Sequence, residues 1–292
     1  MILWNSYRFF ANNAAADNWQ PQNKSLPKPN HILDKWIVSR FTTTTNQVAE
    51  NLDHFDAFHA TQAIENFVND LSLWYIRRSR DRVGPSVTET DDKNQTYQTM
   101  RFIFTHLSLI LAPLIPFIAD RMFTNLTGEA SVHLANWPKL DQSLLDSKLE
   151  TDMKLAREIV EKVHAQRKAA NIKVRQPLEK FTVTGLLNSL SPEIQHLITQ
   201  ETNVKNMLFG SGKDFTVELD VTITPALKVE GEARELIRQI QTARKAAGTA
   251  LSEWVTVELP TWPLEYESEI KQKTLAKKLI KGSTLQIHGE TS

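Results

Sequence analysis

The sequence predicts a mainly helical fold in which an antiparallel helical bundle is followed by a small α/β domain. Between residues 3 and 126, apolar side chains recur at the three- and four-residue spacing of amphipathic helices, and only short stretches separate these segments. After residue 150, helical patterns alternate with short runs of β-branched and aromatic residues that are typical of strands. We therefore expect a helical domain over residues 1–140 and an α/β domain over residues 150–292.

The first domain is expected to open with a short helix. One face of this helix is marked by Leu3, Tyr7, Phe10 and Ala14. The stretch 18–30 contains three prolines and is predicted to be a loop.

Three further helical patterns follow in the first domain. They cover residues 33–52, 57–80 and 91–126, and an aspartate at 53 or 56 can cap the second. Pro113 and Pro116 should kink or split the third pattern near Ala112. Residues 132–138 are expected to leave the bundle as a strand or loop.

The second domain is expected to mix helices and strands. The predicted helices are 152–170, 192–201, 230–247 and 263–280. The predicted strands are 181–184, 204–209, 215–223, 254–259 and 285–288.

An internal similarity links two of these helices. Residues 158–171 align without gaps on residues 235–248, and both segments contain Arg-Lys-Ala-Ala before a C-cap residue, Asn171 or Gly248. Two helices that present an Arg-Lys pair at their C-terminal ends would explain the match, and chance similarity would explain it equally well.

The composition is that of a folded globular protein, with 41% hydrophobic and 23% charged residues. The 34 basic and 34 acidic residues cancel, so affinity for a polyanion must come from local clusters. The absence of cysteine excludes disulfides, thiolate nucleophiles and the usual structural zinc sites. The first ten residues do not resemble a signal peptide, and the most apolar stretch, 107–119, is too short to cross a bilayer, so we expect a cytoplasmic protein without a membrane partner.

Arginines and aromatic residues cluster at the end of the second predicted helix. Four arginines occupy positions 77, 78, 80 and 82, directly after Trp74 and Tyr75. If the helix continues at 100° per residue, Trp74, Tyr75 and Arg78 lie near the apolar stripe, whereas Arg77 and Arg80 turn toward solvent. Guanidinium groups beside aromatic rings suit phosphate contacts and base stacking in single-stranded RNA. The same residues also fit a structural role, with Trp74 in the core, Arg78 in an ion pair and cations at the negative end of the helix dipole.

Two further basic groups lie in the second domain. The first contains Arg167, Lys168, Lys173 and Arg175, and the second contains Arg234, Arg238, Arg244 and Lys245. Arg234 and Arg238 are one helical turn apart and could follow a phosphate backbone, although a helix face with nearby glutamates is more often simply solvated.

The sequence lacks a recognisable catalytic constellation. Gly210-Ser211-Gly212-Lys213 does not have the spacing of a phosphate-binding loop, and His54 and His59 are not spaced for a helical zinc pair. Asp91 and Asp92 fit a helix start better than a catalytic pair. We expect this chain to contain no catalytic residue, no metal site and no cofactor.

Several longer segments are characteristic of a known family. They are Leu3-Trp4-Asn5-Ser6-Tyr7-Arg8-Phe9-Phe10, Leu33-Asp34-Lys35-Trp36-Ile37-Val38-Ser39-Arg40, residues 70–80, Ala112-Pro113 with Pro116-Phe117-Ile118-Ala119, Ser131-Val132-His133-Leu134, Trp137-Pro138, Lys173-Val174-Arg175-Gln176-Pro177-Leu178, Asn203-Val204-Lys205 and Arg234-Glu235-Leu236-Ile237-Arg238. In these segments the chain resembles the C-terminal half of isoleucyl-tRNA synthetases, specifically their eukaryote-like branch, which also occurs in some bacteria. The resemblance covers nearly the whole chain.

The resemblance implies part of a class I ligase that activates isoleucine with ATP and transfers it to tRNA(Ile). In that family ATP and Mg²⁺ bind a Rossmann-type domain N-terminal to this region, and the two nucleotide-binding signatures of the class do not occur in this sequence. We therefore expect this chain alone to be unable to form aminoacyl-adenylate. The expected partner is tRNA(Ile), bound by a monomer.

The resemblance also implies that residues 1–140 form the helical anticodon-binding domain of a class I synthetase and that residues 150–292 form its C-terminal junction domain. Together they would hold the anticodon stem-loop. The expected contacts to tRNA are made by Trp74, Arg77, Arg78, Arg80, Lys173, Arg175, Arg238, Arg244 and Lys245. The stretch between residues 209 and 230 is short where many relatives carry an insertion, so recognition of individual bases does not transfer from them.

Two alternatives remain open at this point. Valyl and leucyl synthetases share the helical bundle, although a valyl enzyme would end in a coiled-coil arm. A stand-alone synthetase-like module that binds RNA or protein without catalysis is an alternative of a different class.

Overall fold

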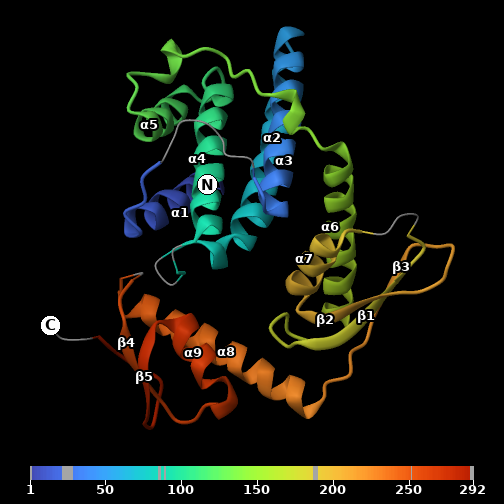
Figure 1. Ribbon diagram of the computed structural model, residues 1–292, viewed down its shortest axis with the longest axis vertical. Helices are drawn as coiled ribbons and strands as arrows, with labels where there is room; N and C mark the ends of the chain where they lie inside the picture. The colour runs from blue at the N-terminus through green and yellow to red at the C-terminus, as the bar shows by residue number, and fades with distance from the viewer. Residues whose placement is uncertain are drawn as a thin grey trace. The chain divides into compact units, whose positions relative to one another are not determined.

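The computed structural model describes residues 2–21, 29–84, 87–88, 90–186, 190–250 and 252–289. The chain divides into two compact units, Met1–Glu150 and Thr151–Ser292. Helices dominate the first unit and mix with strands in the second, so the predicted fold class is confirmed (Figure 1). Of the loop predicted for residues 18–30, positions 22–28 lie outside the described residues. In the described part of the chain, no helix is both long and apolar enough to span a membrane.

The first unit begins with helices α1 (Ile2–Ala16), α2 (Ile32–Asp53) and α3 (Ala57–Asp70). Helices α2 and α3 form a hairpin (Figure 1). The rings of Phe41 and Phe67 pack between them, with centroids 5.1 Å apart. The turn is closed by Asp56, which caps α3 by accepting a hydrogen bond from the His59 amide. Phe55, also in this turn, has a left-handed backbone with φ of 59° and is 97% exposed.

A π-helical segment, η1 (Leu71–Ile76), continues α3 and precedes a short 3₁₀ turn, η2 (Arg80–Arg82). The prediction of a regular helix over residues 57–80 was therefore wrong in its last turns. A π-helix has i→i+5 hydrogen bonds and so accommodates an extra residue in the turn. As a result Ile76 and Ser79 are buried, while Trp74 and Arg78, which were predicted to lie near the apolar stripe, remain partly exposed.

Helices α4 (Asp91–Leu111) and α5 (Pro116–Thr127) complete the bundle. The two helices are separated at the two prolines, as predicted. Proline is well suited to the first position of α5, because the amide hydrogen that it lacks would have no partner within the helix there. Thr90 caps α4, and Gly128 ends α5 with φ of 73°. The predicted exit segment contains a 3₁₀ turn, η3 (Val132–Leu134), rather than a strand, and a second turn, η4 (Gln142–Leu144), follows it.

Helix α6 (Ser147–Ala169) leads into the first sheet of the second unit. This sheet contains β1 (Leu178–Thr184), β2 (Val204–Phe209) and β3 (Thr216–Leu219), with helix α7 (Pro192–Thr202) between β1 and β2. The order is β2-β1-β3, and β1 pairs parallel with β2 and antiparallel with β3. The Gln166 side chain joins α6 to this sheet by bonding the carbonyl of Val217 and the amide of Leu219.

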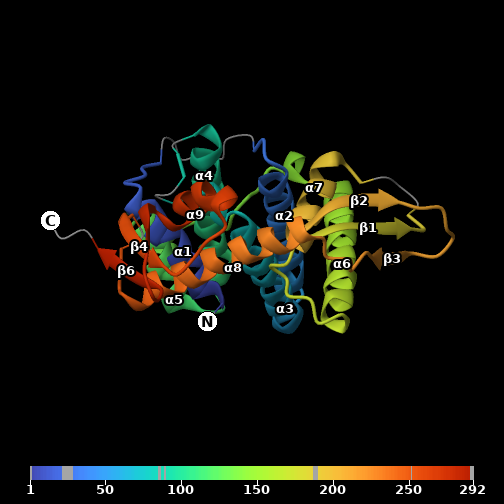
Figure 2. The same ribbon diagram turned by 90° about the horizontal axis from the view of Figure 1, so that it is seen from below.

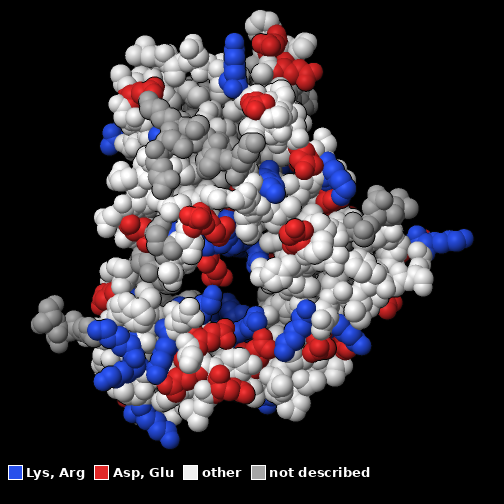
Figure 3. Space-filling view, viewed as in Figure 1, with Lys and Arg blue, Asp and Glu red and all other residues white. Residues whose placement is uncertain are grey.

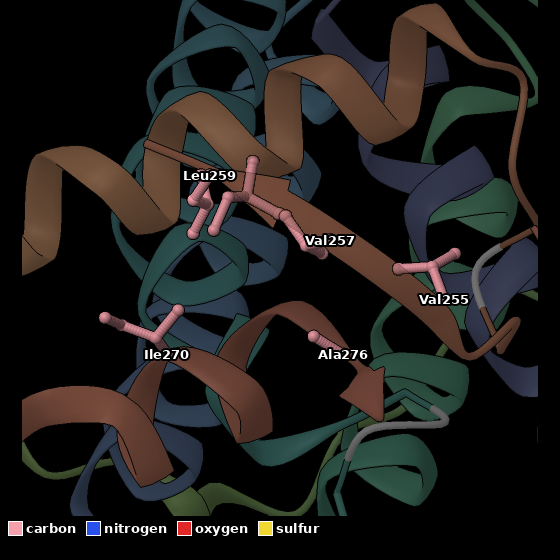
Figure 4. Close-up of a cluster of buried hydrophobic side chains, with 6 residues drawn as sticks. Val255, Val257, Leu259, Ile270 and Ala276 are labelled. Carbon is pink, nitrogen blue, oxygen red and sulfur yellow. The ribbon is translucent and has the colours of Figure 1, made fainter. Parts of the chain in front are cut away.

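The second sheet has the same arrangement. Helix α8 (Pro225–Ala246) precedes β4 (Val255–Leu259), helix α9 (Glu267–Thr274), β5 (Ala276–Lys281) and β6 (Gln286–Gly289), with the turn η5 (Leu264–Tyr266) before α9. The order is β5-β4-β6, with β4 parallel to β5 and antiparallel to β6. Figure 1 labels β5 next to β4, and Figure 2 labels β6 next to β4. Alternate residues of β4 are buried against the helices, and Figure 4 shows Val255, Val257 and Leu259 facing Ile270 and Ala276.

The prediction of one helix over residues 263–280 was wrong in its last part. Helix α9 ends at Thr274, because Leu275 takes a left-handed conformation with φ of 51°. The following residues form β5, which pairs with β4. The lysine-rich pattern reflects only the helical preference of neighbouring residues. The strand is stabilised by hydrogen bonds to β4, whose residues lie about 20 positions earlier in the sequence.

Candidate functional site

The arginine cluster at the end of η1 presents two exposed guanidinium groups. Arg77 and Arg80 are exposed, whereas Arg78 and Trp74 are partly buried. Arg77 is oriented by a 2.8 Å hydrogen bond from its Nε to the carbonyl of Leu73. The guanidinium carbon of Arg80 lies 6.0 Å from the centroid of the Phe9 ring. Each of the two side chains is thus oriented by a contact, and both residues are exposed.

Arg82 has a different role from its neighbours. Its side chain is only 10% exposed and donates to both oxygens of Asp34, at 3.0 and 2.7 Å, and to both oxygens of Asp92, at 3.0 and 2.7 Å. The buried hydroxyl of Tyr75 donates to Asp34 at 2.7 Å. This network anchors η2, the turn that begins at Arg80, to α2 and α4.

The network also shifts several pKa values. Burial, followed by the charge of Asp34, raises the pKa of Tyr75. The hydrogen bonds from Arg82 lower the pKa of Asp92. Burial acts to lower the pKa of Arg82, but its hydrogen bonds with Asp92 and Asp34 outweigh burial and raise it. All these shifts favour a neutral tyrosine and a charged Arg82 between carboxylates.

Sequence reasoning assigned no partner to Arg82 and missed Asp34. The signal that could have identified Asp34 is its position between Leu33 and Trp36, inside an apolar stripe where a carboxylate requires a partner. Asp34 is fully buried, and its partner lies 48 residues away in the sequence. The pattern alone does not identify that partner.

The second unit contains a groove of about 700 Å³. Its polar and charged walls are formed by the loop after α6 and by α8, and its apolar wall by the segment after β4. The lining residues are Lys173, Arg175, Gln176, Lys228, Val229, Gly231, Glu232, Glu235, Leu236, Gln239, Thr261, Trp262 and Pro263. The groove therefore combines cations and an indole ring, the side chains that contact phosphates and bases in single-stranded RNA.

Two of the predicted contact residues converge on one glutamate beside this groove. Arg175 lies 3.6 Å from Glu235, and Arg238 donates three hydrogen bonds to it, the shortest of 2.6 Å. The hydrogen bond from Arg238 is the main cause of the lowered pKa of Glu235. Arg238 is thus held by an acid on its own helix.

Arg234 makes a similar contact. It bonds Glu230, at 2.8 Å, and the side chain of Asn203. The ridge of Arg234 and Arg238 suggested by the sequence is therefore formed by ion-paired side chains, in which the arginines are 42% and 41% exposed and their glutamate partners less so.

Arg244 does not lie on the surface as the sequence led us to expect. It is 8% exposed, and its guanidinium donates to the carbonyls of Ala250 and Glu253, at 3.3 and 2.8 Å. The physical reason is the left-handed turn at Gly248, which folds the chain back over the end of α8. Its neighbour Lys245 is exposed.

The charges of the described residues do not form a broad basic surface. Figure 3 shows lysine and arginine side chains interspersed with acidic ones over the visible face. Binding of a polyanion must therefore depend on small groups of cations, as the zero net charge implies. Of the predicted contact residues, Arg77 and Arg80 in the first unit and Lys173, Arg175 and Lys245 in the second are exposed.

Comparison with known proteins identifies the family. The chain is 33% identical to an isoleucine-tRNA ligase of Dehalococcoides mccartyi, over 97% of the chain and 31% of the relative. It is 35% identical to that of Clostridium acetobutylicum, over 91% and 27%, and 34% identical to that of Protochlamydia amoebophila, over 88% and 24%. The chain thus spans less than a third of the length of these relatives. Residues 34–182 match the family described as the anticodon-binding domain of tRNA ligase, and the chain belongs to that family.

Proposed function

We propose that this chain binds the anticodon stem-loop of tRNA(Ile) as the C-terminal part of an isoleucine-tRNA ligase. Membership of the anticodon-binding family supports RNA binding, and the similarity to isoleucine-tRNA ligases over most of the chain supports isoleucine as the amino acid. In the whole ligase, activation of isoleucine with ATP and Mg²⁺ would take place in a catalytic domain outside these residues.

The observation that carries the proposal is the pair of exposed arginines, Arg77 and Arg80, close in sequence to the buried Arg82–Asp34 pair. A flexible arginine loses side-chain entropy when it binds a phosphate, whereas these two are already tethered at the carbonyl of Leu73 and the ring of Phe9. Trp74 is partly exposed beside them and offers a ring for base stacking.

The groove in the second unit supplies the second contact. Lys173 and Arg175 are exposed on its rim and suit phosphates, while Trp262 and Leu236 give an apolar wall against which a base can lie. Arg238 and Lys245 extend the cationic rim along α8. Arg244 is omitted from this surface because its guanidinium is occupied by carbonyls.

Three parts of this proposal go beyond the comparisons. We propose that the protein acts in the cytoplasm and as a monomer. The eukaryote-like branch also stays a prediction, since the relatives named above are bacterial.

The test is a binding titration with tRNA(Ile) transcripts whose anticodon is intact or replaced, over a series of salt concentrations. We expect weaker binding to the replaced anticodon and an affinity for both that falls as salt rises. Equal affinities for the two transcripts would show that binding is not directed at the anticodon.

A further inference from the structure

Residues 147–289 contain two copies of one α-β-α-β-β module. The first copy is α6-β1-α7-β2-β3 and the second is α8-β4-α9-β5-β6. In both, the first strand is central, pairs parallel with the second and antiparallel with the third. In both, the helix between the first two strands ends in a left-handed residue, Asn203 with φ of 54° and Leu275 with φ of 51°.

The copies also share hydrogen bonds at equivalent places. The carbonyl of Asn203 accepts from the amide that opens β1, at 3.1 Å, and the carbonyl of Leu275 accepts from the amide that opens β4, at 3.0 Å. Gly210 donates to the carbonyl of Val183, and Gly282 donates to that of Leu259. The similarity of residues 158–171 and 235–248 therefore reflects a structural repeat, not chance.

The closest correspondence is a buried arginine at the end of the first helix in each copy. Arg167 donates to the carbonyls of residues 173 and 176, at 3.3 and 2.8 Å, and Arg244 donates to those of residues 250 and 253, at 3.3 and 2.8 Å. The acceptors are six and nine positions after the arginine in both copies. Each guanidinium thus fixes the loop that joins the helix to the central strand.

Burying a guanidinium for this purpose is costly. Arg167 is 1% exposed, and the hydrogen bonds described for it all go to backbone carbonyls, including that of Asn203 at 2.9 Å. Burial lowers its pKa to about 10. An apolar side chain would fill the same space without desolvating a charge. Retaining the arginine is understandable if the shape of the loop matters.

The two loops differ in what they carry. The first holds Lys173 and Arg175, both exposed on the rim of the groove. The equivalent positions in the second loop are Ala250 and Ser252. A buried arginine therefore holds a loop with two cations in the first copy and a loop with two uncharged residues at the same positions in the second.

We propose that Arg167 is a positioning residue for tRNA binding, which holds the loop 170–177 in the shape that presents Lys173 and Arg175 to the phosphate backbone. This rests on the proposed function, because it requires that these two cations contact RNA. Arg244 holds the equivalent loop in the second copy, but that loop carries no cations at the equivalent positions to present to RNA. The repeat thus provides a control at an equivalent site in the same chain.

The experiment compares the full 292-residue chain with R167M, R167K, R244M, the double variant K173A/R175A and the triple variant R167M/K173A/R175A. Affinity for a tRNA(Ile) transcript is measured over a series of salt concentrations, and circular dichroism gives the folded fraction. R167K keeps the charge and most of the stem, and so remains informative if R167M does not fold.

We expect R167M and R167K to weaken binding about tenfold and to lower the salt slope by about 1 to 2, the value for one or two lost phosphate contacts. R244M should leave the slope unchanged, even if it lowers stability as much. The triple variant should bind no more weakly than K173A/R175A, because Arg167 acts through those cations.

The outcomes that overturn the proposal are distinct from those that overturn the function. If R167M and R167K keep the wild-type salt slope, or if the losses of R167M and K173A/R175A simply add, then Arg167 does not position the cations. If K173A/R175A itself binds normally, this loop does not contact tRNA. Neither the role of Lys173 and Arg175 as tRNA contacts nor the role of Arg167 in positioning them then holds. A chain that binds no tRNA at all would refute the proposed function directly.

Discussion

The guanidinium of Arg82 and the carboxylate of Asp34 meet through two hydrogen bonds, of 3.0 and 2.7 Å, inside the helical bundle. The pair joins the start of α2 to the turn η2, which begins at the exposed Arg80. Asp34 is fully buried and also accepts from Tyr75. Because both partners are charged and withdrawn from water, the pair stabilises the fold only as long as it is complete.

Asp34→Asn should therefore destabilise the first unit strongly. The substitution leaves Asp92 as the only carboxylate bonded to Arg82, so the loss should lie at or below the lower end of the range of about 3–5 kcal/mol that removal of one partner from an isolated buried pair costs. Urea unfolding followed by circular dichroism measures this loss. His59→Ala is the control, because it removes an exposed side-chain contact with Asp56 in the same unit and should change stability far less. Similar values for the two variants would refute a stabilising role for the buried pair.

Stability should decrease as the pH falls below 6.5. Burial, followed by the nearby Arg82 charge, lowers the pKa of His31 from its ordinary value of 6.5, and its Nδ1 accepts a hydrogen bond from the Leu33 amide. The neutral imidazole is thus favoured in the folded state, so its contribution is complete above pH 6.5 and is lost as the pH falls toward the lowered pKa. Burial also lowers the pKa of His106, which adds to the same window.

His31→Asn is the matched test of this pH dependence. Asparagine is also a good N-cap acceptor and does not titrate. We expect the variant to be less sensitive to pH between 6.5 and 5 than the wild type, with the rest of the slope due to His106. An unchanged slope in urea denaturation midpoints would exclude His31 as the source.

Replacement of Arg77 and Arg80 together by alanine should weaken tRNA binding and reduce its salt dependence. Two lost phosphate contacts would lower the salt slope by about 1.5. Arg121→Ala is the control, because this arginine is exposed on α5 of the same unit but lies outside the cluster. Equal salt slopes for the double variant and the wild type would remove these two residues from the RNA-binding surface.

Gly231→Ala should not give the stabilisation expected inside a helix. Alanine is favoured over glycine by about 1 kcal/mol there, but its Cβ would lie 2.5 Å from Oε1 of Gln176. The Gln176 amide is held by a 2.7 Å hydrogen bond to the carbonyl of Leu227, so displacing it costs about 1 kcal/mol. The two effects should nearly cancel.

A double-mutant cycle separates these two effects. In the Gln176→Ala background the clash is absent, and Gly231→Ala should raise the free energy of unfolding by about 1 kcal/mol. Equal effects of Gly231→Ala in both backgrounds would show that Gln176 does not restrict this position.

The sequence was sufficient for features with local causes. The spacing of apolar residues located α2 within one residue at either end, and β2 was predicted with the correct bounds. The exposure of Arg77 and Arg80 also followed from helix geometry. These features depend on residues a few positions apart.

The features that sequence reasoning missed depend on distant contacts. Strand β5 was predicted as helix because its pairing with β4 does not appear in the local pattern. The Asp34–Arg82 pair joins residues 48 positions apart. Arg244 looked like a surface cation until the chain beyond Gly248 was seen to fold back onto it.

The π-helical segment η1 has a consequence for how this surface tolerates changes in chain length. Because the wide turn absorbs one surplus residue, α3 before it and the turn η2 after it keep their orientation relative to the core. Deletion of a single exposed residue within it, such as Leu73, would convert the segment to a regular α-helix and still leave the downstream arginines facing outward. Homologues that differ by one residue here could therefore share the same surface.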